Sequence, residues 1–376
     1  MATSPIRVGL IGLSGAAAED YDGTSWTPNA HLPFLRASPH FEIVALLNSS
    51  LESAQAAIKK YGLPVETKAY GDPNELANDS AIDLVVCSVR VDRHFLTVRP
   101  SIVAGKAVYV EWPLDRDLQV AKEMTSLAAQ HNIKTIVGLQ GSFTPAIQKL
   151  QSLVDKGAIG KILGSTVVGA LGNADATESK NVRYFLQREV GGNVMSIHSG
   201  HCLEFVTAVL GQFKSFGSSC SIRRPFIDIV NGDKVIEKGA RNSVPDQILM
   251  YGTVEPSNAP VRISLHSGPG FPGLPRLDWR IQGEKGWLRL TSSVFFLNIG
   301  SPDMKLELFN AETGTVEEIS SDVDEWEVLP LPAHNIAKLY EAYRKNEWHP
   351  TFDWALKKHE LLDRMWQTFD KENAAE

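Results

Sequence analysis

The sequence predicts an α/β protein in which an N-terminal domain with a parallel sheet precedes an α/β domain with a large open, mostly antiparallel sheet. Length is the first observation, because 376 residues at about 150 residues per domain indicate two domains. Strand-like and helix-like segments alternate through the first 140 residues, which is typical of right-handed crossovers and a parallel sheet. After residue 145, successive strand-like runs are joined by turn-rich loops, which favours antiparallel pairing. We therefore expect domains at residues 1–140 and 141–376.

The N-terminal elements are predicted from short apolar runs separated by helical patterns. The run at residues 82–89 is nearly all apolar, as expected of a strand buried on both faces. Thr27 and Pro28 resemble an N-cap followed by proline at the first helical position, so the first helix should begin near Pro28. We expect strands at residues 6–11, 41–47, 82–89, 107–110 and 133–139, and further helices at 51–61, 94–104 and 118–131.

The C-terminal elements follow from the same patterns. Gly191 and Gly192 open a helical stretch that extends to residue 210, and residues 173–181 form a polar loop. We expect other helices at residues 145–156, 334–344 and 354–370, and strands at 162–169, 215–222, 248–254, 261–266, 277–282 and 286–290.

Composition excludes several classes of function. Lys and Arg number 37 against 44 Asp and Glu, a net charge of −7, and no basic run stands out, so direct nucleic-acid binding is not expected. No run of about 18 apolar residues occurs, so no membrane association is expected. Three cysteines without a C-x-x-C motif, and no signal-peptide pattern, predict a reducing, cytoplasmic location.

A glycine turn ends the first predicted strand. Gly12 matches the first glycine of the G-x-G-x-x-G dinucleotide motif, Ser14 stands at the second position and Ala17 at the third. Such a turn lets backbone N–H groups face a pyrophosphate, so we expect Gly12, Leu13 and Ser14 to bind a nicotinamide dinucleotide. The alternative is an ordinary turn from a strand into a loop.

Asn48, Ser49 and Ser50 follow the second strand, where an acid usually binds the ribose 2′-hydroxyl. Since no carboxylate stands there, the sequence favours NADP over NAD, with these three residues as cofactor contacts. The alternative is that Ser49 or Ser50 only caps the next helix.

The carboxyl ends of later strands supply further cofactor candidates, because ligands bind at that edge of open α/β sheets. Arg90 is expected to hold an anionic group, the alternative being a solvated loop charge. The cofactor candidates in this part of the chain are Val89, Arg90, His94, Glu111, Trp112 and Gln140.

Five motifs in order resemble the glucose–fructose oxidoreductase and inositol dehydrogenase (Gfo/Idh/MocA) family. They are VGLIG at 8–12, His94, GKAVYVEWPL at 105–114, VGLQGSFTP at 137–145 and GGNVMSIHSGH at 191–201. The resemblance implies a Rossmann domain followed by an α/β domain with an open sheet. It also implies a nicotinamide cofactor, a small-molecule substrate and a homo-oligomer, a dimer or tetramer, formed through the sheet face.

Two of the family's usual catalytic groups are missing. Trp112 stands where the family has a lysine after Glu111, and Ile197 stands where it has an aspartate four residues before His201. The sequence shares several departures from the family pattern, Trp112 among them, with a subgroup that resembles the fungal galactose-pathway repressor, a non-enzymatic relative that uses a dinucleotide in regulating a transcription factor. The shared motifs are Glu111-Trp112, Leu139-Gln140-Gly141, Gly200-His201 and Val244-Pro245-Asp246.

His201 is the best remaining group for proton transfer, because imidazole titrates near neutrality. His198, three residues earlier on the same helical face, and Tyr184 are the other catalytic candidates. Structural histidines are the alternative for both imidazoles, and a buried core aromatic is the alternative to stacking by Trp112. No metal site is expected, although Glu204 lies three residues after His201.

These observations predict an NAD(P)-dependent oxidoreductase that acts on a hydroxyl or carbonyl of a small polar or sugar-like substrate, with a non-standard catalytic set. Two alternatives stay open. One is a redox-inactive dinucleotide-binding regulator, and the other is a non-redox reaction in the same cleft.

Overall fold

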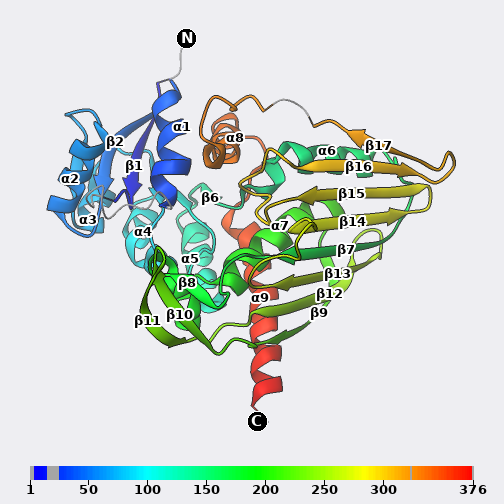
Figure 1. The fold of residues 1–376 in the computed structure, drawn as a ribbon. Coiled ribbons are helices and arrows are strands. Elements are labelled where there is room, and N and C mark those ends of the chain that lie inside the picture. Colours follow the sequence, from blue (N-terminus) through cyan, green and yellow to red (C-terminus); the bar gives the residue numbers. More distant parts are fainter. Residues whose placement is uncertain (1–3, 15–24, 322–323, 375–376) are drawn as a thin grey trace. The chain divides into compact units, whose positions relative to one another are not determined.

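The computed structural model describes residues 4–14, 25–321 and 324–374. The chain divides into two compact units (Figure 1). The first comprises residues 1–140 and 325–357, and the second comprises residues 141–324 and 358–376. The predicted division at residue 140 assigned 325–357 to the second domain, whereas this segment packs with the first. Its helix buries apolar side chains against the Rossmann unit, which local sequence patterns cannot reveal.

The first unit is built on a parallel six-stranded sheet in the order β3-β2-β1-β4-β5-β6. Its strands are β1 (Ile6–Ile11), β2 (Phe41–Leu47), β3 (Lys68–Tyr70), β4 (Leu84–Cys87), β5 (Ala107–Val110) and β6 (Thr135–Val137). All four residues of β4 are buried, as predicted for a strand covered on both faces. The order reverses at β1, so the carboxyl ends of β1 and β4 flank the crevice where doubly wound sheets bind ligands.

The helices of the first unit begin at clear capping residues. The Ser50 hydroxyl caps α2, and the Asp117 carboxylate caps α5. The Tyr340 ring on α8 stacks on Phe34 of α1 with centroids 5.3 Å apart, which fixes the returning segment. The helices are α1 (Leu32–Ala37), α2 (Leu51–Tyr61), α3 (Pro73–Asn78), α4 (His94–Val103), α5 (Leu118–Gln130) and α8 (Leu331–Lys345).

The second unit contains an eight-stranded, mostly antiparallel sheet in the order β17-β16-β15-β14-β7-β13-β12-β9, and a three-stranded sheet in the order β11-β10-β8. The large sheet consists of β7 (Ile162–Ala170), β9 (Phe213–Ser221), β12 (Gln247–Val254), β13 (Pro260–His266), β14 (Leu277–Gly283), β15 (Gly286–Ser292), β16 (Lys305–Asn310) and β17 (Thr315–Ile319). The small sheet consists of β8 (Thr177–Ser179), β10 (Phe226–Asn231) and β11 (Lys234–Arg241). The helices are α6 (Pro145–Asp155), α7 (Ser199–Leu210) and α9 (Phe352–Asn373), whose residues from Lys358 onward belong to this unit.

The structure confirms the predicted fold class and corrects several elements. The expected polar loop at 173–181 contains β8, and β3, α3, β10, β11, β16 and β17 were not predicted. The β11 and β17 strands are mostly exposed, so they lack the apolar alternation that marks a half-buried strand. Helical structure does begin at Thr27, in a π-helical turn over Thr27–His31, but Trp26 occupies the N-cap position. Ala17 and residues 15–24 lie outside the described residues.

Membrane-spanning helices are not found among the described residues, since none of their helices has both the length and the apolar composition that a bilayer requires.

Candidate cofactor site and active site

A cavity of about 1050 Å³ lies in the first unit at the carboxyl ends of β1, β2 and β4. Its position is the crevice of a doubly wound sheet, and its volume suits a large organic ligand. Six of the predicted cofactor residues line it, namely Gly12, Leu13, Ser14, Asn48, Ser49 and Val89. Ser50, Arg90, His94, Glu111, Trp112 and Gln140 are not among its lining residues.

Gly12 is required at the glycine turn for two independent reasons. Its φ is +98°, a conformation that L residues with side chains rarely adopt. A Cβ at this position would also overlap the Ser88 carbonyl oxygen and the Val89 side chain. The turn is tied down by the Thr27 hydroxyl, which donates to the Gly12 carbonyl oxygen at 2.9 Å. This backbone cradle, which a side chain would fill, fits the close approach of a pyrophosphate.

Asn48 braces the rim of the cavity. Its Nδ2 donates to the carbonyl oxygens of Leu13 at 2.6 Å and Ser53 at 3.1 Å. Both amide hydrogens are thereby engaged by the chain, so the expected donation from this amide to a cofactor phosphate is not supported. The Ser50 hydroxyl accepts from Ser53 N at 3.2 Å, which is the helix-cap alternative that the sequence left open.

Glu52 brings a carboxylate into the cavity lining that the sequence analysis missed. It lies on the first turn of α2, one turn before Ala56, which also lines the cavity. A hydrogen bond from its own backbone N–H, joined by one with Ser50, holds the pKa of Glu52 below its ordinary value. The expectation that no carboxylate is available at this edge is therefore wrong. The sequence does contain this acid, but Glu52 stands two residues after Ser50, just past the three positions at which an acid was sought.

Arg90 does not take the role predicted for it. Its guanidinium forms two hydrogen bonds to Asp92, at 2.6 and 2.7 Å, and its side chain is 45% exposed. This is the solvated loop charge that stood as the alternative. Arg93, three residues later, lines the cavity instead and supplies its cation.

Both ring nitrogens of His94 lie within hydrogen-bond distance of backbone carbonyl oxygens. Its Nδ1 lies 2.9 Å from the Pro113 carbonyl oxygen and its Nε2 lies 3.0 Å from the Val89 carbonyl oxygen. The buried ring therefore links the loop after β4 to the loop after β5. Its predicted part in the cofactor site becomes that of positioning Val89, a residue that lines the cavity.

Glu111 lies at the centre of a buried network in the first unit. Its Oε1 is 2.9 Å from His31 Nε2 and accepts from the Tyr109 hydroxyl at 3.0 Å. His31 Nδ1 is 2.8 Å from the Tyr340 hydroxyl. Burial alone would raise the pKa of Glu111, but the hydrogen bonds from His31 and Tyr109 outweigh it and the net shift is downward. Glu111 is thus an ionised, internally bonded carboxylate, and a Cβ at Gly138 would overlap it.

Trp112 and Gln140 are both buried, at 5% and 1% exposed. The Trp112 burial matches the core-aromatic alternative, and its predicted stacking on a cofactor stays a prediction. The Gln140 side-chain oxygen is buried and has no hydrogen-bond partner in the part of the chain that the structure describes. An orphaned buried acceptor of this kind is unfavourable until it is paired, so it fits a contact with a bound ligand.

In the second unit, His198 lies among aromatic rings just before α7. Its ring centroid is 4.7 Å from that of Phe296, and its Nε2 is 3.2 Å from Asn173 Oδ1. Burial, together with the nearby charge of His201, lowers the pKa of His198 to about 3. Such a ring stays neutral near pH 7, so its predicted catalytic role is not supported and the structural alternative fits.

His201 on α7 is 6% exposed and stays the proton-transfer candidate, and Tyr184, whose ring packs edge-on against Phe185, stays a prediction. One turn beyond His201, Glu204 Oε2 lies 3.8 Å from Lys358 Nζ, and both side chains are fully buried. The sequence analysis missed Lys358, because nothing near position 358 indicates a partner on α7. No cluster of three or more metal-ligating side chains occurs within the described ranges.

Two family models match the chain in succession. Residues 6–139 match "Oxidoreductase family, NAD-binding Rossmann fold", and residues 145–292 match "Gal80p, C-terminal domain". Among curated proteins, "Dehydrogenase aclE" of Aspergillus oryzae is 31% identical over 316 residues, which cover 84% of either chain. The galactose/lactose metabolism regulatory protein GAL80 of Saccharomyces cerevisiae is 28% identical over 313 residues, 79% of this chain and 69% of that protein.

Solved structures agree with this fold. A crystal structure of a Saccharomyces cerevisiae Gal80p super-repressor mutant superposes with a TM-score of 0.87 at 24% identity, covering 98% of this chain and 97% of that chain.

Proposed function

This chain belongs to the Gfo/Idh/MocA oxidoreductase family, whose first domain is an NAD-binding Rossmann fold, and on that premise we propose that it is a nicotinamide-dependent oxidoreductase. The proposed substrate is a small polar or sugar-like molecule with a hydroxyl or carbonyl group. The observation that carries the proposal is the cavity at the carboxyl ends of β1, β2 and β4, with the Gly12 turn at its base. The positive φ of Gly12 and its missing Cβ leave the backbone open to the close approach of a pyrophosphate.

For the cofactor we propose NAD(H) rather than the NADP(H) that the sequence favoured. The Glu52 carboxylate lines the cavity on the β2 side, where a ribose binds in doubly wound sheets. A carboxylate accepts hydrogen bonds from ribose hydroxyls, but it repels a 2′-phosphate. The Asn48 amide that was expected to help bind that phosphate is engaged by Leu13 and Ser53.

The chemistry that the bound nicotinamide supplies is acceptance or donation of a hydride. The chain must then move the hydroxyl proton and hold the reacting carbon in place. We assign the proton transfer to His201, with Tyr184 as the second candidate. We assign Gln140 to ligand binding through its orphaned oxygen.

A dinucleotide-binding regulator is the second candidate, and specific observations favour it. Trp112 and Ile197 replace two ionisable groups that hydride-transfer relatives use, and the second domain matches the Gal80p C-terminal model. An indole cannot donate or accept a proton near neutral pH, so Trp112 cannot replace the lysine.

One experiment separates the two candidates. Purified protein is titrated with NADH and NADPH by fluorescence, and its turnover is followed at the nicotinamide absorbance with sugars, polyols and ketones. Oxidoreduction predicts turnover of at least one substrate and its loss in His201→Ala. Tight dinucleotide binding without turnover across the panel would support the regulator, and no dinucleotide binding would overturn both.

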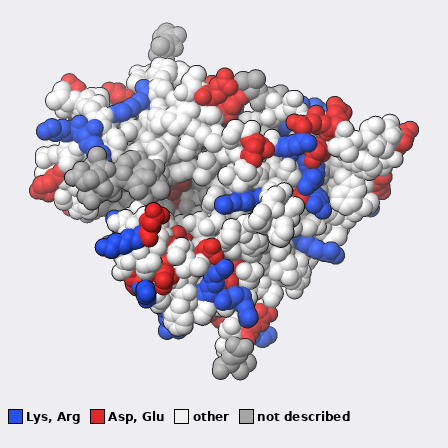
Figure 2. Space-filling view, in the orientation of Figure 1, with Lys and Arg blue, Asp and Glu red and all other residues white. Residues whose placement is uncertain are grey.

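We also propose that the chain forms a homo-oligomer through the outer face of the large sheet. Val168, Leu249 and Tyr251 on this face are 48%, 41% and 50% exposed. The register places Val168 and Leu249 in one row, since both lie opposite Ser264 of β13. Figure 2 shows Lys and Arg side chains interspersed with Asp and Glu side chains over the face that it draws. Light scattering of the wild type and of Tyr251→Glu tests this interface, with dissociation expected in the variant.

A further inference from the structure

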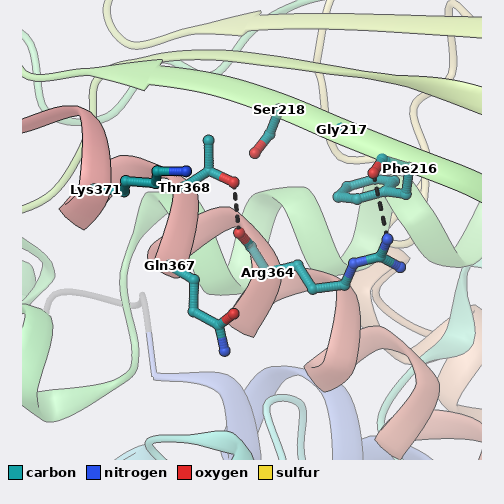
Figure 3. Close-up of a pocket in the computed structure, with 7 residues that line it drawn as sticks. All are labelled: Phe216, Gly217, Ser218, Arg364, Gln367, Thr368 and Lys371. Carbon is teal, nitrogen blue, oxygen red and sulfur yellow. Dashed lines mark hydrogen bonds between the residues drawn. The ribbon is translucent and has the colours of Figure 1, made fainter.

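A second cavity lies in the second unit, between β9 and the C-terminal half of α9 (Figure 3). Its volume is about 340 Å³, at the lower end of the range for small-molecule sites. Three of its lining residues belong to β9 and four to α9. It shares no residue with the cavity at the Gly12 turn, so the proposed dinucleotide site does not account for it.

Sequence spacing explains why these side chains gather. Arg364, Gln367, Thr368 and Lys371 stand at positions i, i+3, i+4 and i+7 of α9, which places them on one face of the helix. Figure 3 shows α9 lying beside β9, with Thr368 pointing toward the strand and the Ser218 hydroxyl pointing from the strand toward the helix. The helix therefore forms a cationic wall opposite a polar strand residue.

Arg364 and Lys371 are the two cations of this wall. Among the described residues, neither Arg364 nor Lys371 forms an ion pair with an Asp or Glu. Arg364 Nη2 donates only to the Phe216 carbonyl oxygen, at 3.4 Å, which leaves most of its N–H groups available.

Two of the nearby carboxylates on α9 are engaged by other side chains, and Glu372, the residue after Lys371, is a third nearby carboxylate. Asp370 accepts from Arg188 Nη2 at 2.8 Å, and Asp363 accepts from Gln367 Nε2 at 2.6 Å. The arrangement contrasts with the opposite side of the helix, where the Arg188 guanidinium is neutralised by Asp370 and lies 4.1 Å from the centre of the Trp366 ring. The two sides of one helix thus differ in whether their cations are neutralised.

Ser218 is a second, independent observation that points to a ligand. Its residue is 6% exposed and lines the cavity. Its hydroxyl points from β9 toward α9 (Figure 3), so it can donate a hydrogen bond to an acceptor atom of a ligand in the cavity.

We propose that this cavity binds a small organic anion with at least two carboxylate or phosphoryl groups. Arg364 suits such groups because its planar guanidinium can donate two parallel hydrogen bonds, and Lys371 adds a point charge. Seven residues of helix separate their Cα atoms by about 10 Å, which favours a ligand with two anionic groups over a single small ion. The Ser218 hydroxyl can donate a further hydrogen bond from the β9 side of the cavity.

Isothermal titration calorimetry tests the proposal. Citrate and pyrophosphate are the carboxylate and phosphoryl probes, and glycerol is the neutral probe, all at constant ionic strength and with NADH saturating so that the first cavity is occupied. We expect at least one anion to bind and glycerol not to bind. The stronger anion identifies which of the two chemical groups the site prefers.

Variants locate the binding. Arg364→Gln combined with Lys371→Gln should lower the affinity for the anion at least about tenfold. Ser218→Ala should lower it a few fold. Each change removes hydrogen-bond donors to the anion. Arg241→Gln combined with Lys238→Gln removes the same charge from exposed positions outside the cavity and should leave binding unchanged. Absence of anion binding, or equal weakening in both double variants, would overturn the proposal. If NADH itself fails to bind, the anion titration is run alone, so that failure of the proposed function is seen separately. Matching thermal unfolding of the wild type and variants establishes that each is folded.

Discussion

The two units bury polar groups in different ways. In the first unit, Glu111, His31 and Tyr340 form a chain of short hydrogen bonds. The Asn48 side chain there donates two hydrogen bonds to backbone carbonyl oxygens at the edge of the cavity. In the second, Glu204 and Lys358 are fully buried at 3.8 Å, and His198 is held neutral among aromatic rings. The first unit thus holds a ligand cradle in one rigid geometry. The second holds His201, the proposed proton-transfer group, and there the buried charges of Glu204 and Lys358 depend on each other.

The largest effect is expected from a substitution that breaks the Glu204–Lys358 pair of the second unit. Lys358→Met leaves Glu204 buried without its cation and should lower the free energy of unfolding by about 3–5 kcal/mol. The double variant Lys358→Met/Glu204→Leu should recover most of that loss, because an apolar pair needs no desolvation of charge. Urea unfolding measures both, and Lys357→Met, at a neighbouring position outside the pair, is the control. If Lys358→Met lowers the free energy of unfolding no more than Lys357→Met does, Glu204 does not depend on Lys358 for its stability.

The next effect tests the rigid cradle of the first unit. Gly12→Ala should lower the free energy of unfolding by about 1–3 kcal/mol and weaken NADH binding at least about tenfold, because the backbone must move away from Ser88. Gly62→Ala is a matched control, since Gly62 also has a positive φ, of +56°, but a Cβ added there would meet no atom within 4 Å. Equal loss of NADH affinity in both variants would show that the overlap at Gly12 does not matter.

A smaller effect concerns pH and the Glu111 network. The pKa of Glu111 is lowered in the folded state, so its ionised form stabilises the fold above the unfolded value of about 4.5. That stabilisation is lost as the pH falls below this value toward the folded pKa. The free energy of unfolding should therefore decrease more steeply between pH 6 and pH 3.5 in the wild type than in Glu111→Gln. Parallel pH profiles would show that Glu111 carries no shifted pKa.

The smallest effect sharpens the cofactor comparison. Glu52→Gln should reduce the preference for NADH over NADPH by about three- to tenfold, because it removes one partly solvated like charge. Competition binding of the two nucleotides measures the ratio. Glu75→Gln removes a carboxylate of the first unit that does not line the cavity and should leave the ratio unchanged. An unchanged ratio in Glu52→Gln would assign the selectivity elsewhere.

Local sequence patterns predicted much of the fold and part of the site. The strands at 41–47 and 107–110 and the helix at 51–61 have the predicted bounds, because apolar runs and capping residues act over a few neighbours. Gly12 was identified for the same reason, since a turn needs its glycine locally. Arg90 was chosen over Arg93 because spacing alone cannot tell which of two loop cations faces inward.

The sequence by itself determined the alternation of elements, the glycine turn and the two missing ionisable groups at Trp112 and Ile197. Only the tertiary structure decided that Tyr340 meets His31 across 309 positions of the chain and that Lys358 meets Glu204. It also placed Glu52 in the lining of the first cavity and Arg364 in the lining of the second. Spacing along a chain governs local conformation, whereas the partner of a buried charge depends on which distant segments the topology brings together.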